Sequence, residues 1–271
     1  MNCPHCQSSK TRALSNTTDL GYAIYRCACC RRNFNERTGT QFNFLEMPTD
    51  IVFQVVLFRL LFKLSLRELV QMFLIRGYEF SHEAVRDWET RFAALLADEV
   101  RRRRKRRASR FWHVDETYLK VSGKWCYLYR AIDRDGELID SMLSAARDMA
   151  AAQRFFRGAK AVAGRTPEQV TTDGHDAYPR AISEVLGKQV KHRCSRYKNN
   201  RLEQDHRGVK QRYYPMFGFS AFESAKRFCE AFDELRNYFR ARRTMNEFVS
   251  LPRRRELFVK RVQALRLMFL A

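Results

Sequence analysis

Three acidic residues, far apart in this chain of 271 residues, have surroundings that suit metal-dependent chemistry. Asp115 lies in the middle of Phe-Trp-His-Val-Asp-Glu-Thr-Tyr-Leu, a predicted strand with apolar side chains on both faces, although strands disfavour aspartate. Asp173 follows the short strand-like segment Val-Thr-Thr, and Glu203 lies in a predicted helix. A buried carboxylate needs a cation, a metal ion or a proton beside it. These three acids are the candidate catalytic residues.

Carboxylates from three distant positions could together hold two divalent metal ions. Two such ions, roughly 3.5–4 Å apart, activate a water or a 3′-hydroxyl and stabilise the leaving oxygen in phosphodiester transfer. We expect two Mg²⁺ ions at Asp115, Asp173 and Glu203, replaceable by Mn²⁺, because hard ions prefer carboxylate oxygens. Each acid alone is explained better as a turn, capping or surface residue among the 30 acids of the chain, and only the three together, in this order, favour catalysis. Glu116, next to Asp115, is expected to point to the other face of the strand and to be dispensable.

Cysteines near the start of the chain predict a second, structural metal site. Two Cys-x-x-Cys pairs are separated by 20 residues, which is the spacing of a tetrahedral Cys₄ zinc ribbon. Residues 1–46 lack apolar bulk, so one zinc ion would supply their folding energy. The predicted zinc ligands are Cys3, Cys6, Cys27 and Cys30.

Free thiols are the alternative to this zinc site, and Cys29 and His5 are possible substitute ligands. The other cysteines are scattered and indicate no disulfide framework. Together with the absence of an export-signal pattern, this favours a reducing bacterial cytoplasm, in association with the nucleoid.

The elements that must position the three acids follow from changes in the hydrophobic period. The first acid lies on a strand, the second after the fourth strand and the third on a late helix. This order predicts a mixed α/β fold of the ribonuclease H-like type. The predicted strands are 111–121, 124–133, 137–145, 169–172 and 189–192, and the predicted helices are 149–162, 177–186, 203–213, 221–243 and a last one after Pro252.

Residues 47–100 predict a helix-turn-helix DNA-binding domain. A helix begins at Pro48, a second begins at Ser65 with Glu68 completing a capping box, and residues 81–92 form the recognition helix. A three-helix unit with a purely structural role is the alternative. The side chains expected to be exposed on the recognition helix are His82, Arg86 and Arg91.

The charge balance favours a polyanionic partner. Lys and Arg number 51 against 30 Asp and Glu, which leaves a net charge of +21 and a pI near 10.1. Nucleic acid relieves such self-repulsion, and we expect double-stranded DNA rather than a membrane, because no apolar run is long enough to span one.

A basic linker at residues 101–110 is expected to track phosphates, with a solvated helix end as the alternative. Lys210, two helical turns after Glu203, is a further candidate phosphate ligand, and the role of His206 stays open. The basic run consists of Arg101, Arg102, Arg103, Arg104, Lys105, Arg106 and Arg107.

The segments around the three acids resemble the DDE transposases of the bacterial insertion-sequence-six family. Residues 113–118 read His-Val-Asp-Glu-Thr-Tyr, and residues 123–133 read Gly-Lys-Trp-Cys-Tyr-Leu-Tyr-Arg-Ala-Ile-Asp. Residues 172–178 read Thr-Asp-Gly-His-Asp-Ala-Tyr, and residues 198–206 read Lys-Asn-Asn-Arg-Leu-Glu-Gln-Asp-His. The resemblance runs from about residue 66 to residue 243.

The resemblance implies an integrase-type catalytic core, Mg²⁺ dependence, replicative strand transfer and a homodimer or larger assembly. The expected reaction nicks DNA at the element's ends and joins the exposed 3′-hydroxyl to target DNA. The alternatives are a catalytically inactive, transposase-derived DNA-binding regulator and a ribonuclease H-type nuclease. The predicted domains are a zinc ribbon (1–46), a helix-turn-helix (47–100), a basic linker (101–110), a catalytic domain (111–220) and C-terminal helices (221–271).

Overall fold

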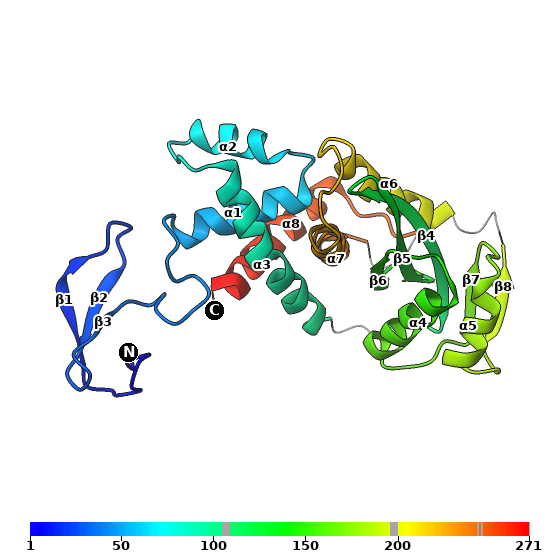
Figure 1. The fold of residues 1–271 in the computed structure, drawn as a ribbon, viewed down its shortest axis with the longest axis horizontal. Coiled ribbons are helices and arrows are strands. Elements are labelled where there is room, and N and C mark those ends of the chain that lie inside the picture. The colour runs from blue at the N-terminus through cyan, green and yellow to red at the C-terminus, as the bar shows by residue number, and fades with distance from the viewer. Residues whose placement is uncertain (105–108, 196–199, 243, 245, 271) are drawn as a thin grey trace. The chain divides into compact units, whose positions relative to one another are not determined.

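The computed structural model describes residues 1–104, 109–195, 200–242, 244 and 246–270 (Figure 1). Within α6 it leaves out the side chains of residues 200, 201 and 203–205. Lys105, Arg106 and Arg107 of the predicted linker therefore lie outside the described residues, as does the side chain of Glu203. Contacts divide the chain into two compact units, with the boundary between Val55 and Val56.

The first unit is built on a small antiparallel sheet. Its strands are β1 (Thr11–Thr17), β2 (Ala23–Cys27) and β3 (Asn33–Phe34), in that order across the sheet. Its apolar core is small and includes Cys3, Cys27 and Phe34. Polar contacts therefore contribute to the order of the unit: the buried Arg37 guanidinium donates hydrogen bonds to the carbonyls of Phe42 and Leu45.

Three helices follow, and the third is longer than predicted. They are α1 (Thr49–Leu61), which crosses the boundary between the units, α2 (Leu66–Leu74) and α3 (His82–Arg102). The predicted capping box of Ser65 and Glu68 is present at α2. The prediction that the third helix ends near Phe92 is wrong, because Leu96 and Val100 continue its buried stripe. The first two arginines of the predicted linker thus belong to α3.

A five-stranded mixed sheet forms the centre of the second unit. Across it the order is β6-β5-β4-β7-β8, antiparallel among β4–β6 and parallel from β4 through β7 to β8. β7 pairs with the stretch Phe111–His113 of β4, so the later part of β4 extends beyond it. The strands are β4 (Phe111–Val121), β5 (Lys124–Asp133), β6 (Leu138–Ser144), β7 (Gln169–Thr172) and β8 (Lys191–Cys194).

Helices cover both faces of this sheet. α4 (Met149–Ala163) and α5 (Ala177–Val185) pack on one face, where Trp112, Val114 and Phe155 form part of a fully buried core. Arg130 alternates along β5 with residues of that core and instead pairs with Asp233 on α7 (Phe222–Phe239), on the opposite face. The remaining helices are α6 (Asn200–Tyr213) and α8 (Leu251–Leu270).

The predicted C-terminal helices are part of the same body as the sheet. α7 packs against both β6 and α3, and the ring of Phe269 on α8 lies 5.3 Å from the ring of Phe92 on α3. The mixed α/β class predicted from the sequence is confirmed. Among the described residues, no helix has the length and apolar character needed to cross a bilayer.

Candidate active site and metal centres

The parallel pairing of β4 with β7 brings two of the predicted acids together. His113 is the register partner of Thr171. Asp115 lies two residues after His113 on β4, and Asp173 lies two residues after Thr171, directly beyond the end of β7, so the register brings the two acids close together. Asp115 is buried, and its Oδ1 accepts a hydrogen bond of 3.0 Å from the backbone N–H of Glu116. The Oδ1 of Asp173 accepts one of 3.1 Å from the N–H of His175. Backbone donors therefore orient both carboxylates.

Three carboxylates meet at this point. Asp115, Glu116 and Asp173 each offer one oxygen, and the three oxygens lie within 4.8 Å of one another. Hard oxygen donors this close together suit Mg²⁺ or another small divalent ion. Glu203 lies on α6, which packs along β4, although its side chain is outside the described residues. The structure thus groups Asp115 with Asp173 and places the third acid on a neighbouring helix.

Glu116 has a more specific environment than the sequence indicated. Its side chain turns toward α5, as strand alternation requires, and accepts a hydrogen bond from the hydroxyl of Tyr178. It also pairs with Arg147, whose guanidinium lies 3.5 Å from a carboxylate oxygen of Asp173. Burial, and then the charge of Glu116, raise the pKa of Tyr178, so this hydroxyl stays protonated. Glu116 therefore supports Asp173 through Arg147.

A second group of buried acids lies between β6, α7 and the end of α3. Arg101 lies between Asp140, at 3.1 Å, and Glu234, at 3.0 Å. Arg104 pairs with Glu234 and donates to the carbonyls of Leu138 and Ile139. Burial raises the pKa of Asp140 to about 6, although Arg101 opposes the shift. These two arginines are among the predicted DNA contacts, and in the structure they also join the end of α3 to β6 and α7.

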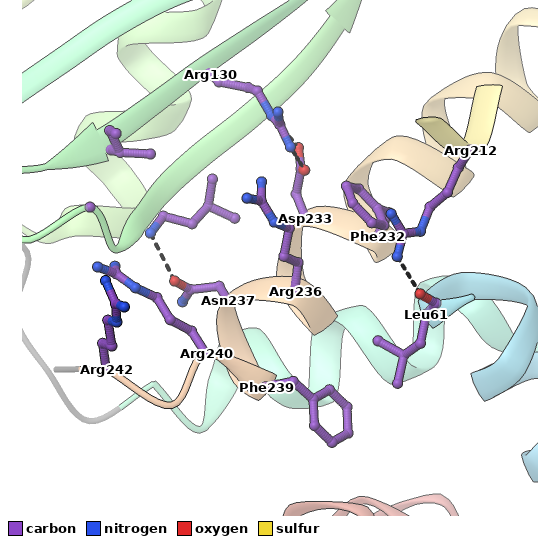
Figure 2. Close-up of a pocket in the computed structure, with 13 residues that line it drawn as sticks. Leu61, Arg130, Arg212, Phe232, Asp233, Arg236, Asn237, Phe239, Arg240 and Arg242 are labelled. Carbon is purple, nitrogen blue, oxygen red and sulfur yellow. Dashed lines mark hydrogen bonds and ion pairs between the residues drawn. The ribbon is translucent and has the colours of Figure 1, made fainter. Parts of the chain in front are cut away.

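Arginines also line a hollow of about 390 Å³ beneath α6 and α7 (Figure 2). Arg130 points at Asp233 there, and Arg212 donates to the carbonyl of Leu61. The guanidinium of Arg212 also lies 4.5 Å from the ring centre of Phe232. Arg130 thus joins β5 to α7, and Arg212 joins α6 to α1. The arginines that line the hollow are Arg130, Arg212, Arg236, Arg240 and Arg242.

His206 is buried on α6 in this basic region. Burial lowers its pKa to about 3, and the charges of Arg130, Lys210 and Arg236 act in the same direction. Its imidazole is therefore neutral at neutral pH and does not act as a proton donor there.

The four predicted zinc ligands lie together in the first unit. The sulfur of Cys3 is 3.6 Å from that of Cys30, and the sulfur of Cys6 is 3.6 Å from that of Cys27. A tetrahedral site with Zn–S bonds of about 2.3 Å requires sulfur–sulfur separations of about 3.8 Å. This cysteine cluster fits a zinc ribbon.

The structure separates Cys29 and His5 from that cluster. The four grouped sulfurs are those of the two Cys-x-x-Cys pairs, whereas the sulfur of Cys29 lies 3.2 Å from the hydroxyl of Ser8. Cys29 is exposed. It is therefore not needed to complete four-coordinate geometry.

The predicted DNA-contacting residues fall into different environments. Arg86 on α3 is exposed and lines a groove of about 800 Å³, together with Arg67 and Lys120. Arg91 pairs with Asp87 at 3.3 Å. The exposed Arg102 and Arg103 both pair with Glu99 at 2.5 Å. Lys210 lines a separate hollow with Tyr118 and other aromatic side chains.

Comparison with known proteins extends these observations. A family profile described as "DDE domain" matches residues 109–242. The transposase for insertion sequence-like element IS431mec of Staphylococcus aureus strain Mu50 is 33% identical over 175 residues, which cover 63% of this chain and 77% of that protein.

A second relative and one solved structure are also similar. The transposase for insertion sequence element IS257 in transposon Tn4003 of Staphylococcus aureus has the same identity and coverage. The simian T-cell lymphotropic virus intasome in complex with the PP2A regulatory subunit B56 gamma is 17% identical, with a TM-score of 0.37, over 48% of this chain and 49% of that chain.

Proposed function

The chain belongs to the insertion-sequence-six family of DDE transposases, and on that premise we propose which of its residues perform the reaction. It is a DNA transposase and a DDE polynucleotidyl transferase. We propose that Asp115, Asp173 and Glu203 are its catalytic acids. The observation that carries this assignment is the register of β4 and β7, which brings Asp115 close to Asp173.

The arrangement of the second unit supports a ribonuclease H-like core. Numbered along the chain, its sheet has the order 3-2-1-4-5, with the first three strands antiparallel and the last two parallel. The first strand carries Asp115, the fourth ends just before Asp173, and α6 carries Glu203. This order would bring the three acids together beside the end of β7, where β4 extends beyond it.

The acids would hold two Mg²⁺ ions, with Mn²⁺ as a substitute. Bound there, the metal ions supply activation of the attacking oxygen and stabilisation of the leaving oxygen. The backbone N–H groups of Glu116 and His175 hold the carboxylates of Asp115 and Asp173 in position. In the first step water attacks the phosphodiester at the element's end, a P–O bond forms, and the old bond breaks to leave a 3′-hydroxyl. In the second step that hydroxyl attacks a target phosphodiester and releases the other 3′-hydroxyl.

The other parts of the chain would position DNA. We assign α2 and α3 to a helix-turn-helix, with Arg86 and Arg91 at the element's ends, and Arg102, Arg103 and Lys210 to phosphates. Lys105, Arg106 and Arg107 keep the same proposed role outside the described residues. If Arg102 and Arg103 contact phosphates, replacing both with Gln flattens the dependence of DNA affinity on salt. An unchanged slope contradicts their assignment.

Zinc and self-association complete the proposal. One zinc ion at the four grouped cysteines would stabilise residues 1–46. Elemental analysis that finds no zinc in protein prepared without chelators contradicts this site. Joining two element ends favours a homodimer or larger assembly, and sedimentation of the DNA complex as a single chain contradicts that.

Two other functions are less consistent with the site. A DNA-binding regulator without chemistry has no need for oriented, closely grouped carboxylates. A ribonuclease H-type nuclease would cut but not join strands. Joining of a labelled end to target DNA separates both from a transposase.

The direct test replaces the acids one at a time. Asp115→Asn, Asp173→Asn and Glu203→Gln should each lower both nicking and joining by about 1,000-fold or more, with DNA binding retained. Double variants should be no worse than single ones, because the acids act as a unit. Robust joining by Asp173→Asn would rule out this active site.

The structure also selects the control for this test. Glu116→Gln is unsuitable, because Glu116 contacts Arg147 beside Asp173. Asp176 is exposed, lies three residues after Asp173, and makes no side-chain cap hydrogen bond at α5. Asp176→Asn should therefore keep wild-type joining.

A further inference from the structure

Aromatic and lysine side chains line an open hollow of about 500 Å³ on the later part of β4. They come from β4, from β5 and from the C-terminal end of α6 with the residue that follows it. We name this surface the aromatic platform. Its members are Tyr118, Lys120, Trp125, Tyr127, Lys210, Tyr213 and Tyr214.

Three rings of the platform are unusually open to solvent. Tyr118 is 45% exposed, Trp125 57% and Tyr214 66%, whereas Trp112 and Phe155 in the same domain are fully buried. Rings of this size contribute most when they are covered. Open rings gathered in one hollow are a feature of surfaces that bind a ligand.

The platform is held in a fixed shape. The ring of Tyr118 packs edge-on against Trp125, with centroids 6.3 Å apart, and against Tyr127, at 5.5 Å. The hydroxyl of Tyr213 accepts a hydrogen bond of 3.0 Å from the backbone N–H of Lys120, which ties α6 to β4. A ligand would thus meet preformed ring faces and would not have to order them first.

The platform adjoins the catalytic acids. Tyr118 lies two residues after Glu116 on β4 and therefore on the same face of the strand as Glu116. The guanidinium of Arg147 lies 5.8 Å from the ring centre of Tyr118 and 3.5 Å from a carboxylate oxygen of Asp173. Lys210 lies two helical turns after Glu203 on α6. A DNA strand at the acids is therefore within one or two nucleotides of the platform.

The chemistry of the lining indicates the ligand. Two lysines and no acid are found among the described residues that line the hollow, and the Nζ of Lys120 lies 5.2 Å from the ring centre of Trp125. Lysines attract phosphates, while open aromatic faces stack on bases. Bases in a duplex have their faces covered by their neighbours, so this combination suits unpaired nucleotides.

We propose that the aromatic platform binds unpaired nucleotides of the DNA strand next to the phosphodiester that is cut. The inference rests on the proposed function, because it assigns part of the substrate to the same site. Stacking on the platform offsets the cost of opening base pairs at the element's end. It thereby holds the strand beside Asp115 and Asp173.

The test compares two DNA probes in the full-length protein. One is a duplex from the end of the element that carries the gene, and the other has mismatches that unpair the nucleotides at the cleavage position. Fluorescence anisotropy in Ca²⁺ measures binding without requiring the reaction. Wild type should prefer the unpaired probe, and Trp125→Ala and Tyr214→Ala should each weaken its binding about five- to tenfold. Binding of the paired duplex should change by less than about twofold.

Two controls accompany these variants. Trp125→Phe keeps a ring and should retain most of the affinity for the unpaired probe. Phe248 is 86% exposed and does not line the platform, so Phe248→Ala should leave both affinities unchanged.

Three results would overturn the proposal. The first is an unchanged affinity of Trp125→Ala for the unpaired probe, and the second is an equal loss of affinity of the variants for both probes. The third is a changed oligomeric state of the variants with unchanged DNA binding, which would identify a protein-docking surface. Failure of the catalytic assignment can be distinguished from failure of the platform proposal. Joining by Asp173→Asn would refute the acids, while the binding comparison would still decide the platform.

Discussion

The central sheet carries two groups of acids, and their immediate neighbours differ. Around β6 and α7, guanidinium groups lie between the acids: Arg101 separates Asp140 from Glu234, and Arg130 pairs with Asp233. Beside the end of β7, by contrast, oxygens of three carboxylates lie within 4.8 Å of one another, and a single arginine, Arg147, contacts two of them, Glu116 and Asp173.

We expect this difference to separate a structural role from the proposed metal-binding role. Where arginines alternate with acids, the charges are balanced by the fold itself, and the residues join α3, α7 and β6. Where carboxylates crowd together, bringing in a divalent cation lowers their mutual repulsion. The first group should therefore control stability, and the second should control activity and respond to Mg²⁺.

The largest effect on stability is expected from breaking the Arg130–Asp233 pair. Both side chains are almost completely buried, so Arg130→Met leaves an uncompensated carboxylate inside the protein. The free energy of unfolding should fall by about 3–5 kcal/mol, measured by urea denaturation. The double variant Arg130→Met/Asp233→Leu should recover most of that loss.

An exposed pair provides the matched control. Arg180 and Glu184 are one helical turn apart on the surface of α5. Arg180→Met should cost less than about 1 kcal/mol. A similar small cost for Arg130→Met would show that the buried group is not what stabilises this face.

A smaller effect is expected from His206, which faces the arginine-rich side of the sheet. Its pKa falls from about 6.5 in the unfolded chain to about 3 in the folded protein, through burial and then Arg130, Lys210 and Arg236. As the pH falls, the unfolded chain therefore takes up this proton at a higher pH than the folded protein does. The contribution of the neutral imidazole is complete above pH 6.5 and decreases as the pH falls toward 3.

At pH 5 this loss should be about 2 kcal/mol relative to pH 7.5. His206→Phe should remove that part of the acid sensitivity, although it changes the packing at both pH values. The readout is therefore the difference in unfolding free energy between pH 7.5 and pH 5. If wild type and variant lose the same unfolding free energy between pH 7.5 and pH 5, protonation of His206 does not destabilise the folded protein.

The sequence indicated that two of the candidate acids lie close together, but it did not indicate the contacts of the arginines within the protein. Asp115 and Asp173 are recognisable because a strand with apolar faces makes an acid conspicuous, and β7 pairs with β4 as expected for that topology. The run from Arg101 was ambiguous, because a charge run has the same pattern whether its partner is DNA or the protein. The partners of Arg101, Asp140 and Glu234, are 39 and 133 residues away and follow no periodic signal.

Local spacing also could not predict the contacts between elements. Glu116 was expected to be dispensable because alternate side chains point to opposite faces. That alternation is present, but Arg147, from the segment between β6 and α4, connects Glu116 back to Asp173. A single arginine after a strand gives no signal of such a bridge. Glu203 was predicted from the same order of elements, and its catalytic role stays a prediction.

The smallest effect is the one that tests the crowded acids most directly. At a Mg²⁺ concentration ten times its Kd, binding to the folded protein should raise the free energy of unfolding by about 1.4 kcal/mol. Asp173→Asn removes one charged ligand oxygen and should abolish most of this rise, whereas Asp176→Asn should keep it. Asp140, which is paired with Arg101, provides a second control. Asp140→Asn should lower stability but leave the increase in unfolding free energy caused by Mg²⁺ unchanged. Thermal unfolding with and without Mg²⁺ measures all four proteins under the same conditions. If Mg²⁺ stabilises Asp173→Asn as much as wild type, the ion binds elsewhere, and the contrast between the two groups of acids fails.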